Sequence, residues 1–209
     1  MLRHRLEPLT NVTAAYSRRA AEYTDLLGSM EAVHPSDRQL VDTWAESLTG
    51  RVLDAGCGPG HWTNHLAGRG LVVRGIDLVP AFIEHARLSY PNVAFDTGSI
   101  DEIDEPDASL GGVLSWYSTI HHSPAHMSEQ VAEFARVLRS GGGLVLGFFQ
   151  GSAVEQFDHA ITPAYRWPVS QMRELLEVNG FEVIETHQRA GQGVRPVAAV
   201  VCRRIRSRR

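Results

Sequence analysis

Residues 52–60, Val-Leu-Asp-Ala-Gly-Cys-Gly-Pro-Gly, constrain the fold more than any other part of the chain. They read as a short buried strand that runs into a turn with glycines at every second position, Gly56, Gly58 and Gly60. Glycine has no Cβ, so such a turn lets the main chain bend sharply and approach a ligand closely. A helix that begins near His61 would present free N–H groups to that ligand. The sequence therefore predicts a nucleotide-like ligand at the end of this strand.

The spacing of the glycines argues against two other kinds of nucleotide site. The loop reads G-x-G-x-G, whereas dinucleotide-binding loops have G-x-G-x-x-G, in which the glycines serve a pyrophosphate. A P-loop needs a lysine that reaches a phosphate. All 20 basic residues of this chain are arginine, so both a P-loop and a Schiff-base lysine are excluded.

A second acid supports a nucleoside ligand. Residues 71–77 read as the next strand and end in Asp77, which lies 17 residues after Gly60. An acid at the end of the second strand of such a unit is placed to accept hydrogen bonds from a ribose diol. Because a strand-end acid in an open crevice has few structural duties, we expect Asp77 to contribute little to stability.

With Asp54, the three glycines and Asp77 in this order, the chain resembles the class I S-adenosylmethionine-dependent methyltransferases. The resemblance is to the small-molecule branch, of the kind seen in quinone and natural-product biosynthesis, and it extends from Tyr16 to Arg203. Three further segments are similar to the family's third strand and adenine-edge turn, to its fourth strand, and to its helix, glycine turn and fifth strand: 92–100, 112–117 and 137–147.

The resemblance implies S-adenosylmethionine as cofactor and S-adenosylhomocysteine as product. It implies that Asp77 holds the ribose, Leu78 packs on the adenine, and Asp54 acts near the methionine ammonium. It also implies an N-terminal helix that covers the cofactor, with tyrosines on one face. Ser99 stands where the family often has an acid. The complete set of expected cofactor-binding residues is Tyr16, Tyr23, Asp54, Gly56, Cys57, Gly58, Asp77, Leu78, Gly98, Ser99, Ile100, Trp116 and Tyr117.

Two histidines follow the fourth predicted strand directly. Parallel sheets bind ligands outside the carboxyl ends of their strands, so His121 and His122 are candidate general bases, with His121 ahead. The competing interpretation is that they line a loop or cap the next helix. His122 and His126 have the i, i+4 spacing of zinc ligands, but the sequence offers no third ligand, and we expect no metal.

Strands and helices alternate along the chain, which predicts a doubly wound α/β sheet of the Rossmann-like kind. Residues 181–185 and 196–201 read as two strands joined by a link too short for a parallel crossover. We therefore expect seven strands, mostly parallel with one antiparallel strand, and helices on both faces. The 209 residues are expected to form one domain, with an N-terminal helical cover, a core and a basic tail at 1–50, 51–203 and 204–209.

Local patterns predict several helices of this domain. Apolar residues recur at helical spacing over 12–27 and again over 40–48. Pro80 and Pro124 suit the first turns of two further helices, the second of which should end at Ser140 and the following glycines. Ser170 is a candidate N-cap for a last helix that Gly180 would terminate.

Composition limits the partners. The net charge of -4 gives no general attraction to nucleic acid or to an anionic membrane. Two cysteines make no disulfide framework, and we expect neither a secretory signal nor a membrane span, because residues 1–8 lack an apolar region and no apolar run has membrane-spanning length. We expect a cytoplasmic protein with a small-molecule substrate, as a monomer or a homodimer.

The sequence thus favours an S-adenosylmethionine-dependent methyltransferase that transfers a methyl group to an O, N or C atom of a small molecule. Residues 149–167 are expected to border the acceptor. Two alternatives stay open: an NAD(P)-dependent oxidoreductase, and a catalytically silent relative that binds the cofactor. RNA methylation is a minor alternative, because the arginines at 203–209 could grip phosphates.

Overall fold

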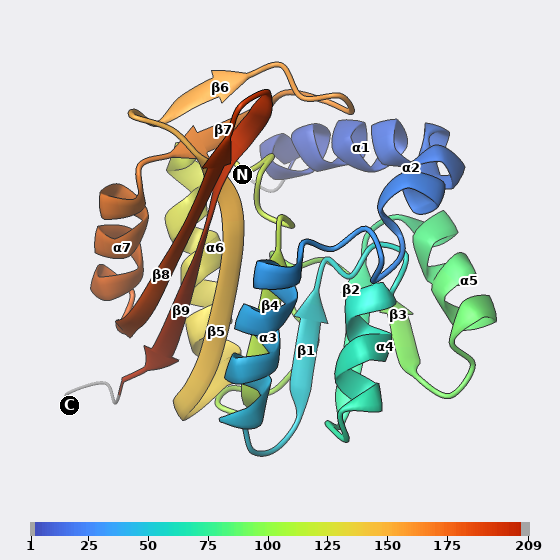
Figure 1. Cartoon of the computed structure of the whole chain (residues 1–209), viewed down its shortest axis with the longest axis horizontal. Coiled ribbons are helices and arrows are strands. Elements are labelled where there is room, and N and C mark those ends of the chain that lie inside the picture. Colours follow the sequence, from blue (N-terminus) through green and yellow to red (C-terminus); the bar gives the residue numbers. More distant parts are fainter. Residues whose placement is uncertain (1–2, 206–209) are drawn as a thin grey trace.

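The computed structural model describes the backbone of residues 3–205 and the side chains of residues 11–205. This part of the chain forms a single sheet with helices on both faces (Figure 1). The helices are α1 (Arg3–Arg18), α2 (Ala20–Leu27), α3 (Pro35–Glu46), α4 (His61–Gly68), α5 (Pro80–Ser89), α6 (Pro124–Val137) and α7 (Val169–Val178). The strands are β1 (Val52–Ala55), β2 (Val73–Asp77), β3 (Ala94–Thr97), β4 (Leu110–Trp116), β5 (Leu138–Gln150), β6 (Glu155–Phe157), β7 (Ala164–Trp167), β8 (Phe181–Gly191) and β9 (Val194–Arg204).

The core of the sheet has the predicted winding. Strands β3, β2, β1, β4 and β5 are parallel neighbours in that order, so the chain reverses its winding direction between β1 and β4. Strand β9 pairs antiparallel with β5, and β8 pairs antiparallel with β9. These seven strands, with β9 as the one reversed strand, confirm the predicted fold class. Ligands of doubly wound sheets bind at such a reversal, beyond the carboxyl ends of the strands.

The sheet branches at the end of β5, which the sequence did not predict. In addition to its pairing with β9, β5 pairs in parallel with β7 through Phe149 and Gln150. Strand β7 in turn pairs antiparallel with β6. The resulting β6–β7 hairpin brings the expected acceptor segment beside α1, above the carboxyl ends of the central strands (Figure 1). None of residues 149–167 lines the pocket at this edge of the sheet, but Pro163 and His159 contact His121, which does.

The N-terminal cover is two helices and not one. The expected helix over 12–27 is broken at Arg19, which separates α1 from α2. Arg19 donates hydrogen bonds to Glu22 and to the carbonyl of Ala160 in the β6–β7 connection. Ala160 is 141 positions away, so no local sequence pattern records this contact at the break. The second expected helix is present as α3.

Two expected helix boundaries were wrong. Helix α7 begins at Val169 after Pro168 as its N-cap residue, so Ser170 lies inside the helix. Helix α6 ends at Val137, and β5 follows at once instead of a separate glycine turn. Gly141, with φ of +80°, lies within β5 where the register against β4 shifts.

The basic cluster begins inside the fold. Arg204 is the last residue of β9, and its guanidinium donates to the carbonyls of Ala135 and Gly180 while lying over the ring of Phe181. Its expected place in a solvated tail was therefore wrong. Residues 206–209 lie outside the described part of the chain. Within the described residues, no helix has the length and apolar character needed to cross a membrane.

The turn from β1 to α4 provides a test of the loop geometry. Gly60 has φ of +89°, and a Cβ there would lie 2.8 Å from Ala86 Cβ and from the ring of Phe95, both of which are buried. We expect Gly60→Ala to lower the free energy of unfolding by about 1–3 kcal/mol, because it combines backbone strain with overpacking. Urea unfolding measures this change.

Gly68→Ala is the matched control. Gly68 lies in α4, and a Cβ built there meets no atom within 4 Å. Such a replacement should keep or raise stability, by about 0.4–1 kcal/mol. Equal effects of the two variants would contradict the argument that Gly60 is required by its surroundings.

Candidate functional site

A pocket lies at the carboxyl ends of the central strands, where residues of α1 and α2 also line it. Its lining includes twelve of the residues that the sequence singled out: Tyr16, Tyr23, Gly56, Gly58, Asp77, Leu78, Gly98, Ile100, Trp116, Tyr117, His121 and His122. Tyr16 and His121, which are 105 positions apart in the chain, thus meet in one place.

Three expected residues do not line this pocket, and five unexpected ones do. Asp54, Cys57 and Ser99 are absent from the lining. The added residues are Val12, Thr13, Val79, Phe82 and Ser118. Helical spacing could have found Val12 and Thr13, because they lie one turn before Tyr16 on α1. The adjacency of the others to expected residues was the only signal in the sequence.

The glycine loop lies directly against the β4 end. Gly56 has φ of +79°, and a Cβ there would come within 2.3 Å of Ser118 Cβ. Its N–H and that of Cys57 both donate to the Ile76 carbonyl, which ties the loop to β2. Gly58 also has a positive φ, but a Cβ there would meet no atom within 4 Å. The loop is therefore packed on its inner side and open at Gly58.

Asp77 holds this loop in place. One carboxylate oxygen accepts the Gly58 N–H at 2.9 Å, and the other accepts the Val79 N–H at 2.8 Å. Burial raises the pKa of the Asp77 carboxyl, while the two N–H donors oppose that rise. Asp77 thus joins the glycine loop to the start of α5. The expectation that it has few structural duties was wrong, because its position at a strand end leaves two backbone donors within reach.

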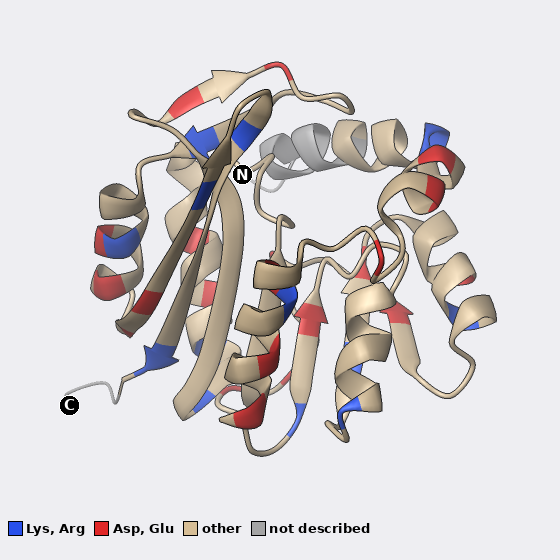
Figure 2. Ribbon diagram, in the orientation of Figure 1, with Lys and Arg blue, Asp and Glu red and all other residues tan. Residues whose placement is uncertain are grey.

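Asp54 lies beneath the loop and away from the pocket. Its side chain is 1% exposed and accepts a 2.6 Å hydrogen bond from Thr63 Oγ1 in the first turn of α4. Burial raises the pKa of Asp54 to about 7, although the bond from Thr63 works in the opposite direction. In this geometry Asp54 fixes the strand–loop–helix unit. Figure 2 shows acidic segments where β1 and β3 end, below the cover helices.

Aromatic rings form the roof and one side of the pocket. On the cover, Tyr16 makes edge contacts with Tyr23, Phe82 and His121 at centroid distances of 5.7, 6.1 and 5.6 Å. At the β4 end, Tyr117 has φ of 59°, a conformation that non-glycine residues seldom adopt. The strain is maintained at the pocket wall, where such outliers tend to occur.

The two histidines make different contacts. His121 Nδ1 lies 2.9 Å from the Pro163 carbonyl and its Nε2 lies 2.9 Å from the Tyr16 hydroxyl. Burial is the main cause that lowers the pKa of His121 below its ordinary value. His122 Nε2 lies 2.7 Å from Asp101 Oδ1, while its buried Nδ1 has no hydrogen-bond partner. Both rings line the pocket, so the structure keeps both as candidates for contact with a ligand.

A metal site is not formed by the histidine pair. His126 Nδ1 bonds to Ser123 Oγ, whereas His122 bonds to Asp101. Across the residues whose placement is described, no group of three or more His, Cys, Asp or Glu side chains could hold a metal ion.

Comparison with known proteins agrees with the fold. Residues 52–142, from β1 to the start of β5, match a family model described as a methyltransferase domain. A solved structure of 1,6-didemethyltoxoflavin-N1-methyltransferase from Burkholderia thailandensis, with S-adenosylhomocysteine bound, superposes with a TM-score of 0.80 at 19% identity. The match covers 99% of this chain and 92% of that chain. The fold is thus that of a Rossmann-like methyltransferase.

Curated relatives extend the similarity to sequence. A probable S-adenosylmethionine-dependent methyltransferase of Mycolicibacterium smegmatis is 33% identical over 151 residues, which are 68% of this chain and 56% of that protein. A ubiquinone biosynthesis O-methyltransferase of Saccharophagus degradans is 28% identical over 138 residues, 63% of this chain and 58% of that protein. The chain therefore spans little more than half the length of these relatives. It belongs to the class I S-adenosylmethionine-dependent methyltransferase family.

The raised pKa of Asp54 predicts a dependence of stability on pH. Between about pH 4 and pH 7 the folded state keeps the Asp54 proton that the unfolded chain has lost, so stability falls as pH rises through this window. The slope is at most about 1.4 kcal/mol per pH unit. In Asp54→Asn the amide oxygen still accepts from Thr63, and we expect a flatter profile. Urea unfolding from pH 4.5 to 7.5 measures the difference.

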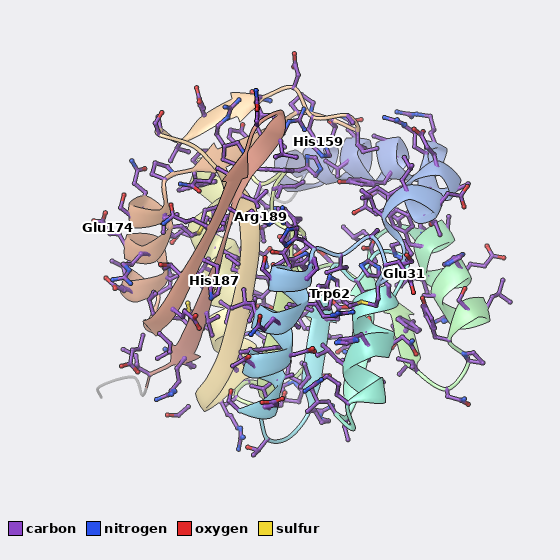
Figure 3. All side chains as sticks on the ribbon, viewed as in Figure 1. Glu31, Trp62, His159, Glu174, His187 and Arg189 are labelled. Atoms are coloured by element: carbon purple, nitrogen blue, oxygen red, sulfur yellow. The ribbon has the colours of Figure 1, made fainter. Side chains whose placement is uncertain are left out.

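Glu174→Gln is the control, because Glu174 lies exposed on the outer face of α7 (Figure 3). It should leave the parental slope unchanged. Parallel profiles for the parent and Asp54→Asn would show that Asp54 is already ionised in the folded protein.

Proposed function

We propose that this protein binds S-adenosylmethionine in the pocket under α1 and α2 and transfers its methyl group to a small molecule. The observation that carries the proposal is the Asp77 carboxylate beside the open face of Gly58, at the reversal of the sheet. A carboxylate has about four acceptor positions. Two accept the Gly58 and Val79 N–H groups, and two are left for a ribose diol.

In the proposal, the other expected residues that line the pocket contact different parts of the cofactor. In this arrangement Leu78, Gly98 and Ile100 surround the adenine, and the Gly56–Gly58 main chain runs along the nucleoside and methionine. Trp116 and Tyr117 border the methionine arm, with Tyr16 and Tyr23 above. Asp54, Cys57 and Ser99 act through the loop and turn that they pack in, because none of them lines the pocket.

An uncharged acceptor fits the pocket best. Asp77 is the only lining residue that carries a carboxylate or a guanidinium, among the side chains of residues 11–205. Since no cation lines the wall, a phosphate or a nucleic acid would lack a partner there. The named relatives that act on a toxoflavin precursor and in ubiquinone biosynthesis support a small-molecule acceptor.

The chemistry places modest demands on the protein. S-adenosylmethionine supplies a methyl group bonded to a sulfonium sulfur. The sulfur leaves as a neutral thioether, so the leaving group needs no further activation. The chain's residues orient the acceptor in line with that methyl, and the aromatic roof excludes water. His121 is the candidate to receive a proton from an O, N or C acceptor. We also propose a cytoplasmic protein, as a monomer or a homodimer, which agrees with two free, buried cysteines.

Ligand binding tests the proposal against the oxidoreductase alternative. We expect calorimetry to show micromolar binding of S-adenosylhomocysteine and no heat with NAD or NADP. Incubation with methyl-labelled S-adenosylmethionine and a metabolite extract should then label an acceptor, detected by mass spectrometry. Binding of NAD without a response to S-adenosylhomocysteine would replace the proposal. Binding without label transfer to any acceptor would favour the silent relative.

Asp77 provides the sharper test of the site. In Asp77→Asn one acceptor oxygen is lost, together with the charge that strengthens the ribose contacts. We expect affinity for S-adenosylhomocysteine to fall about 10- to 100-fold. Stability should also fall, by about 1–3 kcal/mol, because a backbone N–H of Gly58 or Val79 loses its partner. Calorimetry and urea unfolding measure the two effects separately.

The matched control is Asp96→Asn, at the end of the neighbouring strand β3. Asp96 is half-exposed, pairs with Arg74 and Arg87, and lies outside the pocket. Exposed pairs of this kind contribute about 0–1 kcal/mol, so affinity should stay parental. Parental affinity in a folded Asp77→Asn protein would remove Asp77 from the proposed site.

A further inference from the structure

The hydrogen bonds of His121 define which of its nitrogens carries the proton. A carbonyl oxygen only accepts, so the 2.9 Å contact with Pro163 requires a hydrogen on Nδ1. The neutral ring then has its lone pair on Nε2. The Tyr16 hydroxyl, 2.9 Å away, must donate to that lone pair. The nitrogen that would receive a proton from an acceptor is therefore already bonded to Tyr16.

The surroundings keep both groups neutral before reaction. Burial raises the pKa of the Tyr16 phenol far above its ordinary value, and Tyr23 and Asp77 add to that rise. Burial lowers the pKa of His121 against the smaller opposing effect of the Pro163 carbonyl, with His122 adding to the decrease. A phenol that keeps its proton and an imidazole that keeps its lone pair form a connected donor and acceptor.

Three separate segments assemble this pair. Tyr16 comes from α1, His121 from the connection after β4, and Pro163 from the residue before β7. Arg19, one turn beyond Tyr16, donates to Ala160 in the same connection. His159 from that connection packs its ring 5.4 Å from His121, and Figure 3 shows it beside α1. The cover helix and the hairpin thus hold the imidazole from two sides.

We propose that Tyr16 and His121 act as one proton-accepting unit, in which the Tyr16 hydroxyl faces the acceptor and relays its proton to His121 Nε2. The inference rests on the proposed methyl transfer and deepens it. Both residues line the same pocket, so an acceptor bound beside the methyl group can reach the Tyr16 oxygen. The unit exists only while α1 is in place, so proton removal is coupled to closure of the cover.

The step balances without another reactant. The acceptor's O–H or N–H bond breaks, and its proton goes to Tyr16 Oη while the Tyr16 proton goes to His121 Nε2. The electron pair left on the acceptor forms the bond to the methyl carbon, and the carbon–sulfur pair stays on sulfur. The positive charge of the sulfonium ends on the imidazolium, whose Nδ1–H still donates to Pro163. A base with a lowered pKa suits an acidic acceptor, such as a phenol or a heteroaromatic N–H, better than an aliphatic alcohol.

Tyr16→Phe removes the hydroxyl and keeps the ring contacts with Tyr23 and Phe82. With the acceptor found by label transfer, we expect kcat to fall about 10²-fold, at the low end of general-base effects, with S-adenosylhomocysteine affinity within twofold of the parent. His121→Ala should lower kcat by about 10²–10⁴. Because the two residues act as a unit, the double variant should be no slower than His121→Ala.

Histidine NMR provides a readout that needs no acceptor. With ¹⁵N-labelled histidine, the parent His121 should show a protonated Nδ1 and a hydrogen-bonded, unprotonated Nε2. In Tyr16→Phe the neutral ring loses its donor, so the pKa of His121 should rise and the acid limb of the rate profile should move to higher pH. Tyr90→Phe, which removes a phenol hydroxyl from a residue that does not line the pocket, should change neither.

Several outcomes overturn the proposal. An unprotonated Nδ1 in the parent would do so, even if Tyr16→Phe failed to fold. The proposal would also be overturned if Tyr16→Phe had the same kcat and the same His121 titration as the parent. Weaker S-adenosylhomocysteine binding at unchanged kcat would assign Tyr16 to the cofactor alone. A parent that shows the expected histidine spectrum but binds no S-adenosylhomocysteine would instead overturn the proposed function.

Discussion

The two hydrogen bonds that Asp77 accepts from Gly58 and Val79 are the constraint on which the rest of the site depends. They fix the glycine loop against the end of β2 and set the start of α5 in the same contact. The loop in turn packs on Ser118 at the end of β4, and α5 carries Phe82 under the tyrosines of the cover. The Asp77 carboxylate therefore positions the floor and one side of the pocket before any ligand is bound.

The sequence predicted the parts of the candidate site that belong to one strand–loop–helix–strand unit, from β1 to β2. Gly56, Gly58 and Asp77 were recognisable because the main-chain geometry of the loop restricts which residues can stand there. The seven-stranded winding was predictable for a similar reason, since alternating strands and helices leave few topologies. Asp54 belongs to the same motif, yet the direction of its side chain, down toward Thr63, depends on where α4 packs. Its function in the loop was therefore not visible in the pattern.

What the sequence could not predict depends on contacts between distant segments. The hydrogen bond between Tyr16 and His121 joins positions 105 residues apart, and that between Arg19 and Ala160 joins positions 141 apart. The β6–β7 hairpin joins the sheet because β5 extends beyond β4, whose pairing ends at Gly147, so the β4-side edge of Phe149 and Gln150 pairs with β7. Such pairings are properties of the finished sheet, and no local periodicity records them.

The branch of the sheet and the cover helix are best understood together. A helix that only shielded the pocket would need apolar contacts with α5, which Tyr16 and Tyr23 already make with Phe82. The additional polar contacts, from Arg19 to Ala160 and from His121 to both Tyr16 and Pro163, instead connect the cover to the hairpin. Polar contacts depend on distance and direction more strongly than apolar packing does. A small displacement of α1 would therefore disturb the orientation of His121 before it exposed the pocket to water. Under the proposed proton transfer, the position of the cover would thus affect proton removal more strongly than access to the pocket.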